Sequence, residues 1–99
     1  FIKGTGSYVP EGIISNRDVA KLAGISAEWI KTRTGVETRR RALPNQAASD
    51  LAFEASIKAM EEANIRPNEL DLIVMASITP DTHCPAGANW LEAKLDASK

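Results

Sequence analysis

Trp29 and Arg33 are the residues of this sequence whose types and spacing most clearly allow a ligand to bind. They lie four apart in the stretch 26–35, which has the marks of a short helix. Ser26 is a good N-cap, and Gly35 suits the left-handed residue that ends a helix. Because side chains four apart share a helix face, an indole and a guanidinium could hold a flat ligand such as a purine. The spacing also fits a tryptophan packed in a core, with the arginine resting on it as a cation–π pair.

The only histidine and the only cysteine are neighbours, His83 and Cys84, but their spacing argues against catalysis. Adjacent residues of an extended chain point to opposite sides, and Pro85 favours extended backbone at Cys84. The imidazole would then not reach the thiol, as a Cys–His nucleophile pair requires. A metal site lacks further soft ligands. We therefore predict no catalytic residue and no metal site here, and expect Cys84 to be a small hydrophobe packed at a loop or an interface.

Composition excludes several classes of partner. The 99 residues are 43% hydrophobic and 25% charged with a net charge of −1, so no overall field attracts nucleic acid or an anionic membrane. The longest apolar run, 72–76, is too short to cross a bilayer, and no signal peptide is visible. A single cysteine fits a reducing compartment, so we expect a cytoplasmic protein. The arginine run 39–41 could meet an acidic partner, although charge runs are usually solvated faces.

The elements that must position these residues follow a layered α/β order. We expect a strand over 1–10, helices over 15–24 and 26–35, an extended pair or loop over 35–43, a long helix over 46–63 capped by Asn45, a strand over 71–77, a loop over 79–85 and a final helix over 86–95. Gly4 and Gly6 permit close backbone approach in the first strand. The long helix carries a stripe made mostly of alanine, so it can lie close against a neighbouring backbone.

The run 71–77 is the strongest strand signal, and it does not alternate. A continuous apolar run of this length suits a strand that is covered on both faces. Such a strand needs neighbouring strands and a second layer of helices, whereas this chain supplies at most two central strands. The chain also opens on Phe1 rather than Met. We therefore expect a piece of a longer protein.

Several motifs together resemble one family. The stretches GTGSYVPE (4–11), SNRD (15–18) and SAEWIKTRTGV (26–36) occur in order, followed by DLIV (71–74) and TPD (79–81). In this order and spacing they resemble the N-terminal region of β-ketoacyl-(acyl carrier protein) synthase III, the initiating condensing enzyme of bacterial fatty-acid synthesis. The likeness covers nearly the whole chain.

The resemblance implies the thiolase fold, a layered αβαβα arrangement, with residues 1–99 as the N-terminal portion of one domain that is incomplete on its own. It implies a homodimer that takes an acyl group from coenzyme A onto a cysteine and condenses it with malonyl-acyl carrier protein, losing carbon dioxide. The coenzyme A thioester is then a substrate rather than a permanent cofactor.

The resemblance also implies roles for individual residues. Trp29 and Arg33 match positions that hold the adenine end of coenzyme A. Cys84 matches a loop residue at the dimer interface that lines the partner's acyl pocket, so it is not the nucleophile. The catalytic Cys is expected beyond Lys99 and the catalytic His and Asn in the second half, so none of the three lies here. Ile25 stands where members of the family often carry a polar residue.

Two other functions stay open at this point. The chain could belong to a non-catalytic relative that kept the coenzyme A clamp as a binding or scaffolding protein. It could also belong to a condensing enzyme of secondary metabolism, because the 99 residues do not specify the acyl donor.

Overall fold

The computed structural model describes residues 1–97, and the chain divides into two units that are described separately. Residues 10–43 form the small unit, and residues 1–9 together with 44–97 form the large unit. No helix in this described part of the chain is long and apolar enough to cross a membrane.

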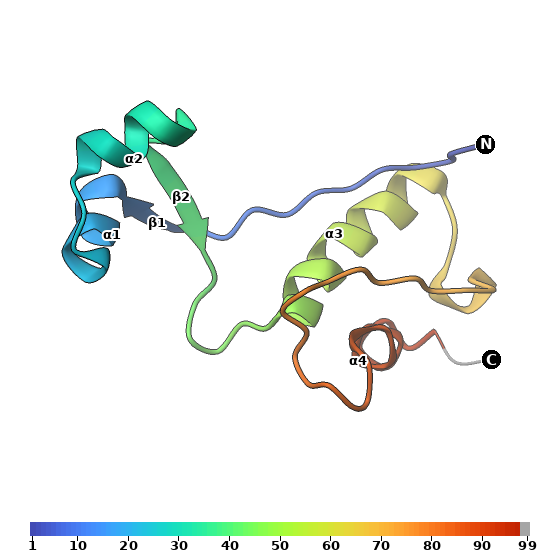
Figure 1. Cartoon of the computed structure of the whole chain (residues 1–99). Helices are drawn as coiled ribbons and strands as arrows, with labels where there is room; N and C mark the ends of the chain where they lie inside the picture. The colour runs from blue at the N-terminus through green and yellow to red at the C-terminus, as the bar shows by residue number, and fades with distance from the viewer. Residues whose placement is uncertain (98–99) are drawn as a thin grey trace. The chain divides into compact units, whose positions relative to one another are not determined.

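The small unit is a two-stranded antiparallel sheet with two short helices (Figure 1). Its elements are β1 (Gly12–Ser15), α1 (Asn16–Ala23), α2 (Ala27–Thr34) and β2 (Thr38–Arg41). The register places Gly12 opposite Arg41 and Ser15 opposite Thr38. The extended backbone predicted over 35–43 is present, but it pairs with β1, a strand that the sequence analysis missed. A four-residue strand carries little local signal when its partner is distant in sequence.

Each helix of the small unit begins after a serine and ends at a glycine, as the sequence predicted. Ser15 forms a capping box with the third residue of α1, and the Ser26 hydroxyl accepts a 3.0 Å hydrogen bond from the Trp29 N–H. Gly24 and Gly35 close the two helices with φ of +66° and +71°. These left-handed angles favour glycine, which has no Cβ to clash with the backbone.

A buried asparagine joins α1 to β2. The Asn16 side chain donates to the carbonyl of Val36 at 2.7 Å, and its backbone N–H donates to the carbonyl of Glu37 at 3.1 Å. The Asn16 amide oxygen in turn accepts a 2.7 Å hydrogen bond from Nη2 of Arg39. The arginine run is therefore only in part the solvated face that was expected. Arg39 is half-buried in this contact, whereas 40–41 are exposed.

The large unit is organised by two helices, α3 (Ala48–Ala63) and α4 (Gly87–Leu95), with a short 3₁₀ turn η1 (Pro67–Glu69) between them. Both helices were predicted, with beginnings one or two residues later than expected. Asn64 ends α3 in the left-handed conformation with φ of +53°. The apolar core lies between the helices and is formed by Met60, Leu91, Leu95 and Ala97, with Phe53, Ile57, Ile65, Leu70 and Ile73 packed around it.

The N-terminal segment runs alongside α3 (Figure 1). A Cβ built on Gly4 would overlap the carbonyl oxygen of Ala59, and one built on Gly6 would overlap that of Ala55. Lys58 holds the same segment by donating a 2.9 Å hydrogen bond from Nζ to the carbonyl of Ser7. The close backbone approach predicted at Gly4 and Gly6, and the one predicted for the alanine stripe, are both confirmed, and the structure shows that they are the same contact.

The two expected strands over 1–10 and 71–77 are not strands in residues 1–97, where the only sheet is the β1–β2 pair. A strand requires a hydrogen-bonded neighbour, and neither segment forms a ladder here. Burial of 71–77 is also one-sided rather than two-sided. Ile73 packs against the core, whereas Leu72 and Val74 are 79% and 82% exposed. The apolar sequence was read correctly, but the layer that would cover its second face is not supplied by these residues.

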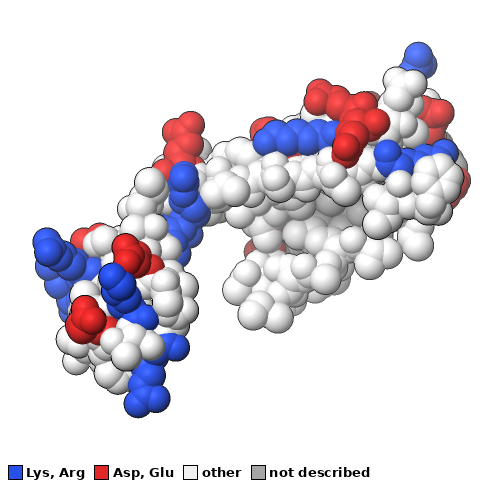
Figure 2. Space-filling model, turned by 90° about the horizontal axis from the view of Figure 1, so that it is seen from above, with Lys and Arg blue, Asp and Glu red and all other residues white. Residues whose placement is uncertain are grey.

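This exposed apolar surface predicts the behaviour of residues 1–99 expressed alone. Figure 2 shows charged side chains gathered along one edge of the large unit and a broad uncharged surface beside them. Exposed contiguous apolar surface favours association, so we expect an aggregated or molten product. Thermal melts and amide NMR spectra would check this against the full-length protein as control. A sharp cooperative melt with dispersed amide signals from the isolated piece would contradict the expectation.

Candidate functional site

Trp29 and Arg33 lie on α2 and contact each other. Cζ of Arg33 lies 5.8 Å from the centroid of the Trp29 ring, which is cation–π distance. Trp29 is 52% exposed, whereas its neighbour Ile30 is buried. The apolar side of α2 is therefore anchored by Ile30, and Trp29 is not a core residue of the small unit. The arrangement combines an accessible indole with an adjacent cation.

The present spacing of the pair limits how a flat ligand could bind. Carbon atoms in contact lie roughly 3.5 Å apart, so a ring sandwiched between two planes needs a gap of roughly 7 Å. The Arg33 guanidinium at 5.8 Å already occupies that space. An adenine held between the two groups thus requires Arg33 to swing outward, which its flexible side chain on an exposed helix permits.

The small unit is positively charged, although the whole chain is not. Residues 10–43 contain seven Lys and Arg against four Asp and Glu, while the rest of the chain contains five against nine. A basic unit attracts anionic ligands such as phosphate esters. The net charge of −1 for the whole chain conceals this asymmetry, which was therefore not predicted from the sequence. Counting charge separately for each predicted segment would have found it.

One basic residue on α2 is already paired. Lys31 forms a 2.7 Å ion pair with Glu37, and their hydrogen bond raises the pKa of Lys31 and lowers the pKa of Glu37. Both side chains are more than half exposed, so water and salt screen the pair and it contributes little to stability. A bound anion can therefore compete with Glu37 for Lys31.

His83 and Cys84 lie on an exposed loop that precedes α4 in the large unit. The Cys84–Pro85 peptide bond is cis. The Thr82 hydroxyl donates a 2.8 Å hydrogen bond to the carbonyl of Pro85 and accepts one of 2.9 Å from the indole N–H of Trp90. The Cys84 thiol is exposed in this chain, so its predicted packing at an interface stays a prediction. Within residues 1–97, no three His, Cys, Asp or Glu side chains are grouped to hold a metal ion.

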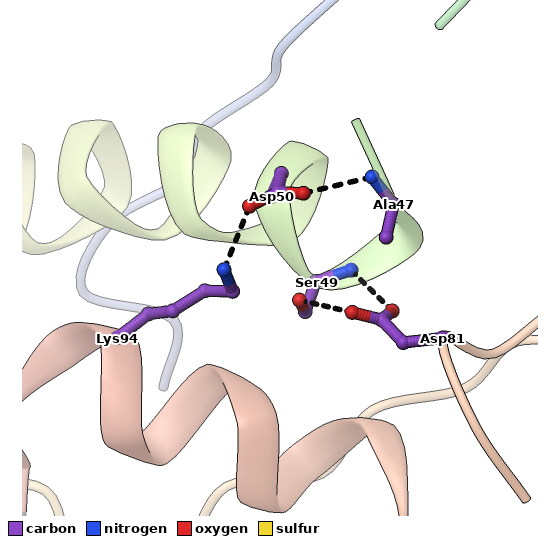
Figure 3. A network of polar contacts seen from close by, with 5 residues as sticks. All are labelled: Ala47, Ser49, Asp50, Asp81 and Lys94. Carbon is purple, nitrogen blue, oxygen red and sulfur yellow. Dashed lines mark hydrogen bonds and ion pairs between the residues drawn. The ribbon is translucent and has the colours of Figure 1, made fainter. Parts of the chain in front are cut away.

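A carboxylate from this loop caps the long helix (Figure 3). The side-chain oxygens of Asp81 accept hydrogen bonds from the backbone N–H and the hydroxyl of Ser49, at 2.8 Å and 2.5 Å. Ser49 is completely buried in the first turn of α3. A buried serine at this position needs such a partner, because an unsatisfied hydroxyl and N–H would be costly.

A second carboxylate completes the start of α3. Asp50 accepts a 2.7 Å hydrogen bond from the backbone N–H of Ala47 and forms a 2.7 Å ion pair with Lys94 of α4. The predicted N-cap, Asn45, is wrong: the N-cap position is Ala47, whose side chain makes no cap bond. Asp50 and the distant Asp81 satisfy the free N–H groups instead, so no local serine, threonine or asparagine is required.

Both carboxylates are held in their ionised form. The Ser49 hydroxyl is the main cause that lowers the pKa of Asp81 below its ordinary value of 3.8. The backbone N–H of Ala47, followed by the Lys94 ammonium, lowers the pKa of Asp50. Hydrogen bonds to a carboxylate and a nearby positive charge both favour its charged form.

Solved structures define the class of protein to which this fold belongs. The 3-oxoacyl-(acyl carrier protein) synthase III from Aquifex aeolicus VF5 matches with a TM-score of 0.87 and 41% identity, over 98% of this chain and 31% of that one. The priming β-ketosynthase of the R1128 polyketide pathway matches with a TM-score of 0.88 and 35% identity, over 98% and 29%. Xanthomonas campestris OleA, at 23% identity and a TM-score of 0.87, supports the fold alone. The chain is an α/β part of a thiolase-like condensing-enzyme fold.

Curated relatives narrow the family. A β-ketoacyl-(acyl carrier protein) synthase III from Caldanaerobacter subterraneus subsp. tengcongensis is 52% identical over 97% of this chain and 29% of its own length. The corresponding protein of Rhodopirellula baltica is 50% identical over 97% and 28%. No family model matches the chain. The resemblance seen in the motifs is confirmed: the chain is similar to the N-terminal part of proteins named β-ketoacyl-(acyl carrier protein) synthase III. It spans less than a third of the length of these relatives.

The lowered pKa of Asp81 predicts a pH-dependent contribution to stability. A carboxyl group whose pKa is lower in the folded state stabilises the fold above its unfolded pKa, and this contribution is lost as pH falls through the folded pKa. In the full-length protein, Asp81→Asn should lower the melting temperature at neutral pH, because a charge-assisted bond becomes a neutral one. The difference from the wild type should shrink below the ordinary value of 3.8.

Thermal melts of the two proteins, recorded from neutral pH to about one unit below that value, check this expectation. Glu54→Gln, an exposed position of the same helix, serves as the control for loss of one charge. A stability difference between wild type and Asp81→Asn that stays constant across the titration would contradict the assignment.

Proposed function

We propose that this chain is the N-terminal part of a β-ketoacyl-(acyl carrier protein) synthase III that condenses an acyl-CoA primer with malonyl-acyl carrier protein to start fatty-acid synthesis. The observation that carries the proposal is 52% identity to a protein of that name over 97% of this chain. The TM-score of 0.87 to a solved synthase III supports it independently.

The proposed reaction is an acyl transfer followed by a decarboxylating condensation. A cysteine thiolate attacks the acyl-CoA thioester and releases the coenzyme A thiol. Malonyl-acyl carrier protein then loses carbon dioxide, and the resulting carbanion attacks the acyl-cysteine and restores the thiolate. We place this cysteine, with the catalytic histidine and asparagine, outside residues 1–99. Coenzyme A is then a substrate rather than a bound cofactor, and the enzyme is a cytoplasmic homodimer.

Within this scheme, residues 1–99 contribute to substrate binding as one portion of a larger thiolase-like domain. We assign Trp29 and Arg33 to the adenine end of coenzyme A. The exposed indole, the adjacent guanidinium and the net positive charge of the small unit support a ligand that is both flat and anionic. We assign Cys84 to the loop that lines the acyl pocket of the partner subunit, which fits its exposure in the single chain.

A second candidate is priming of polyketide synthesis. It is favoured by the match to the R1128 priming β-ketosynthase, which is 35% identical over 98% of this chain. The chemistry is the same condensing reaction in both cases, and the primer and the carrier protein distinguish them.

Intact-protein mass spectrometry of the full-length protein tests the proposed function. Incubation with an acyl-CoA should add one acyl group, and addition of malonyl-acyl carrier protein should remove it with release of carbon dioxide. Cys84→Ser should be acylated at a comparable rate, because Cys84 is not the nucleophile. Loss of acylation in a folded, dimeric Cys84→Ser protein would identify it as the nucleophile. A wild type that binds coenzyme A but is never acylated would instead support the non-catalytic relative.

The proposed binding of adenine by Trp29 and Arg33 predicts that Trp29→Ala selectively loses affinity for acyl-CoA. Stacking of a base on an aromatic ring contributes about 1–3 kcal/mol, and about 1.4 kcal/mol corresponds to a factor of ten. In the full-length protein, Trp29→Ala should therefore raise KM for acyl-CoA roughly tenfold with little change in kcat, because binding remote from the thioester is uniform. Acyl thioesters without the nucleotide should be nearly unaffected.

Two further variants make this test specific. Arg33→Lys should restore only part of the affinity lost in Arg33→Ala, since an ammonium cannot stack as a plane. Arg41→Ala removes an exposed arginine of the same unit and serves as the charge-matched control. Equal impairment with both substrates, or loss of the cooperative melt, would show that Trp29 is a structural residue.

A further inference from the structure

The loop of residues 79–86 and the helix that follows it, α4, are both attached to one turn of α3. At its beginning, Asp81 accepts the two hydrogen bonds from Ser49. After its end, Lys94 of α4 pairs with Asp50, the next residue of the same turn (Figure 3). A loop that is held near its beginning, and is followed by a helix held to the same turn, has few ways to move relative to α3.

The two attachments differ in strength. Lys94 and Asp50 are each about one-third exposed, at 35%, so their ion pair is partly screened by water. The Ser49 end is completely buried, and both of its polar groups face the Asp81 carboxylate. Hydrogen bonds to a charged acceptor are stronger than neutral ones, and a buried donor has no water to replace a lost partner. The Ser49–Asp81 contact is therefore the dominant attachment.

Hydrogen bonds of the loop also restrict its tip, residues 83–84. Thr82 follows Asp81 directly, and its hydroxyl bonds to the carbonyl of Pro85 and to the indole of Trp90. Where α4 begins, Gly87 is buried, and a Cβ at that position would lie 2.9 Å from the sulfur of Met75. The exposed residues between these fixed points are 83–84. The position of these two residues thus depends on the fixed neighbours on both sides.

We propose that Ser49 and Asp81 are positioning residues for the acyl-chain selectivity of the enzyme. They act through the loop: the contact holds the beginning of the loop against the first turn of α3 and so restricts the position of Cys84 three residues on. This inference rests on the proposed function, in which Cys84 lines the acyl pocket of the partner subunit. Neither residue contacts the acyl chain, so their loss should change which acyl chain is preferred without abolishing acyl transfer.

The experiment compares the full-length wild type with Ser49→Ala and Asp81→Ala. The measured quantity is the ratio of kcat/KM for a short straight-chain acyl-CoA to that for a branched acyl-CoA. One methylene group in an apolar pocket changes such ratios by roughly tenfold or more, and we expect a shift of about that size in both variants. Hydrogen exchange of the peptide covering 79–86 should also become faster, because the loop opens more readily. Asp81→Asn, which can still bond to both Ser49 groups, should retain most of the wild-type ratio.

Two controls separate the possible outcomes. Ser15→Ala removes another helix-capping serine, in α1, and should leave the ratio unchanged even if the melting temperature falls. Cys84→Phe alters the loop tip directly and should change the ratio if the loop lines the acyl pocket. If Cys84→Phe changes the ratio but Ser49→Ala and Asp81→Ala do not, the positioning role is overturned while the proposed function stands.

The remaining outcomes are also decisive. If Cys84→Phe has no effect either, the proposed place of the loop in the acyl pocket fails together with the inference. Unchanged hydrogen exchange over 79–86 in Ser49→Ala would overturn the inference without reference to activity. Should Ser49→Ala fail to fold, Asp81→Ala carries the test, because Asp81 lies in a loop and is only half-buried.

Discussion

The large unit depends on how the first turn of α3 obtains its hydrogen bonds. Every α-helix begins with N–H groups that have no partner inside the helix. Here Asp50 satisfies the N–H of Ala47, and Asp81 satisfies that of Ser49 from a loop far along the chain. The requirement of one helix end thus determines where the loop before α4 lies. It also explains how the large unit, which is mostly helical, can present an exposed loop in a defined position.

The alanine stripe of α3 is a second feature of this helix that positions a distant segment of the chain. Because Ala55 and Ala59 are small, the N-terminal segment approaches so closely that only glycine fits at Gly4 and Gly6. Side chains larger than alanine on this face of α3 would hold the segment away and lose the close packing. One face of α3 therefore fixes the beginning of the chain, while its core side packs against α4.

In the small unit, the residues that stabilise the fold differ from those that are exposed on α2. Its fold depends on polar contacts at helix ends and on Asn16, which joins α1 to β2. Its apolar burial is modest, and Ile30 is the anchor of α2. The side chains left outward on α2 include an indole and a guanidinium, in a segment with excess positive charge. A unit built in this way can present an exposed aromatic ring and positive charge without weakening a core.

The sequence alone determined the features that depend on neighbouring residues. The serine N-caps, the glycine C-caps, the spacing of Trp29 and Arg33, and the extent of α3 and α4 all follow from contacts within about one helical turn. The motifs also identified the family, because order and spacing of several short stretches are more specific than any one of them.

Only the tertiary structure decided the features that depend on distant partners. The strand β1 exists because Thr38–Arg41 pairs with it, and the segment 71–77 lacks a ladder because no neighbour lies beside it in residues 1–97. Asn45 was the best local cap for α3, yet Asp81 took that role with a carboxylate that no local pattern could connect to Ser49. Strand pairing, and capping by a residue distant in sequence, bring together residues that no local sequence pattern connects. Local preference therefore predicts that a helix needs a cap, and the folded chain decides which residue provides it.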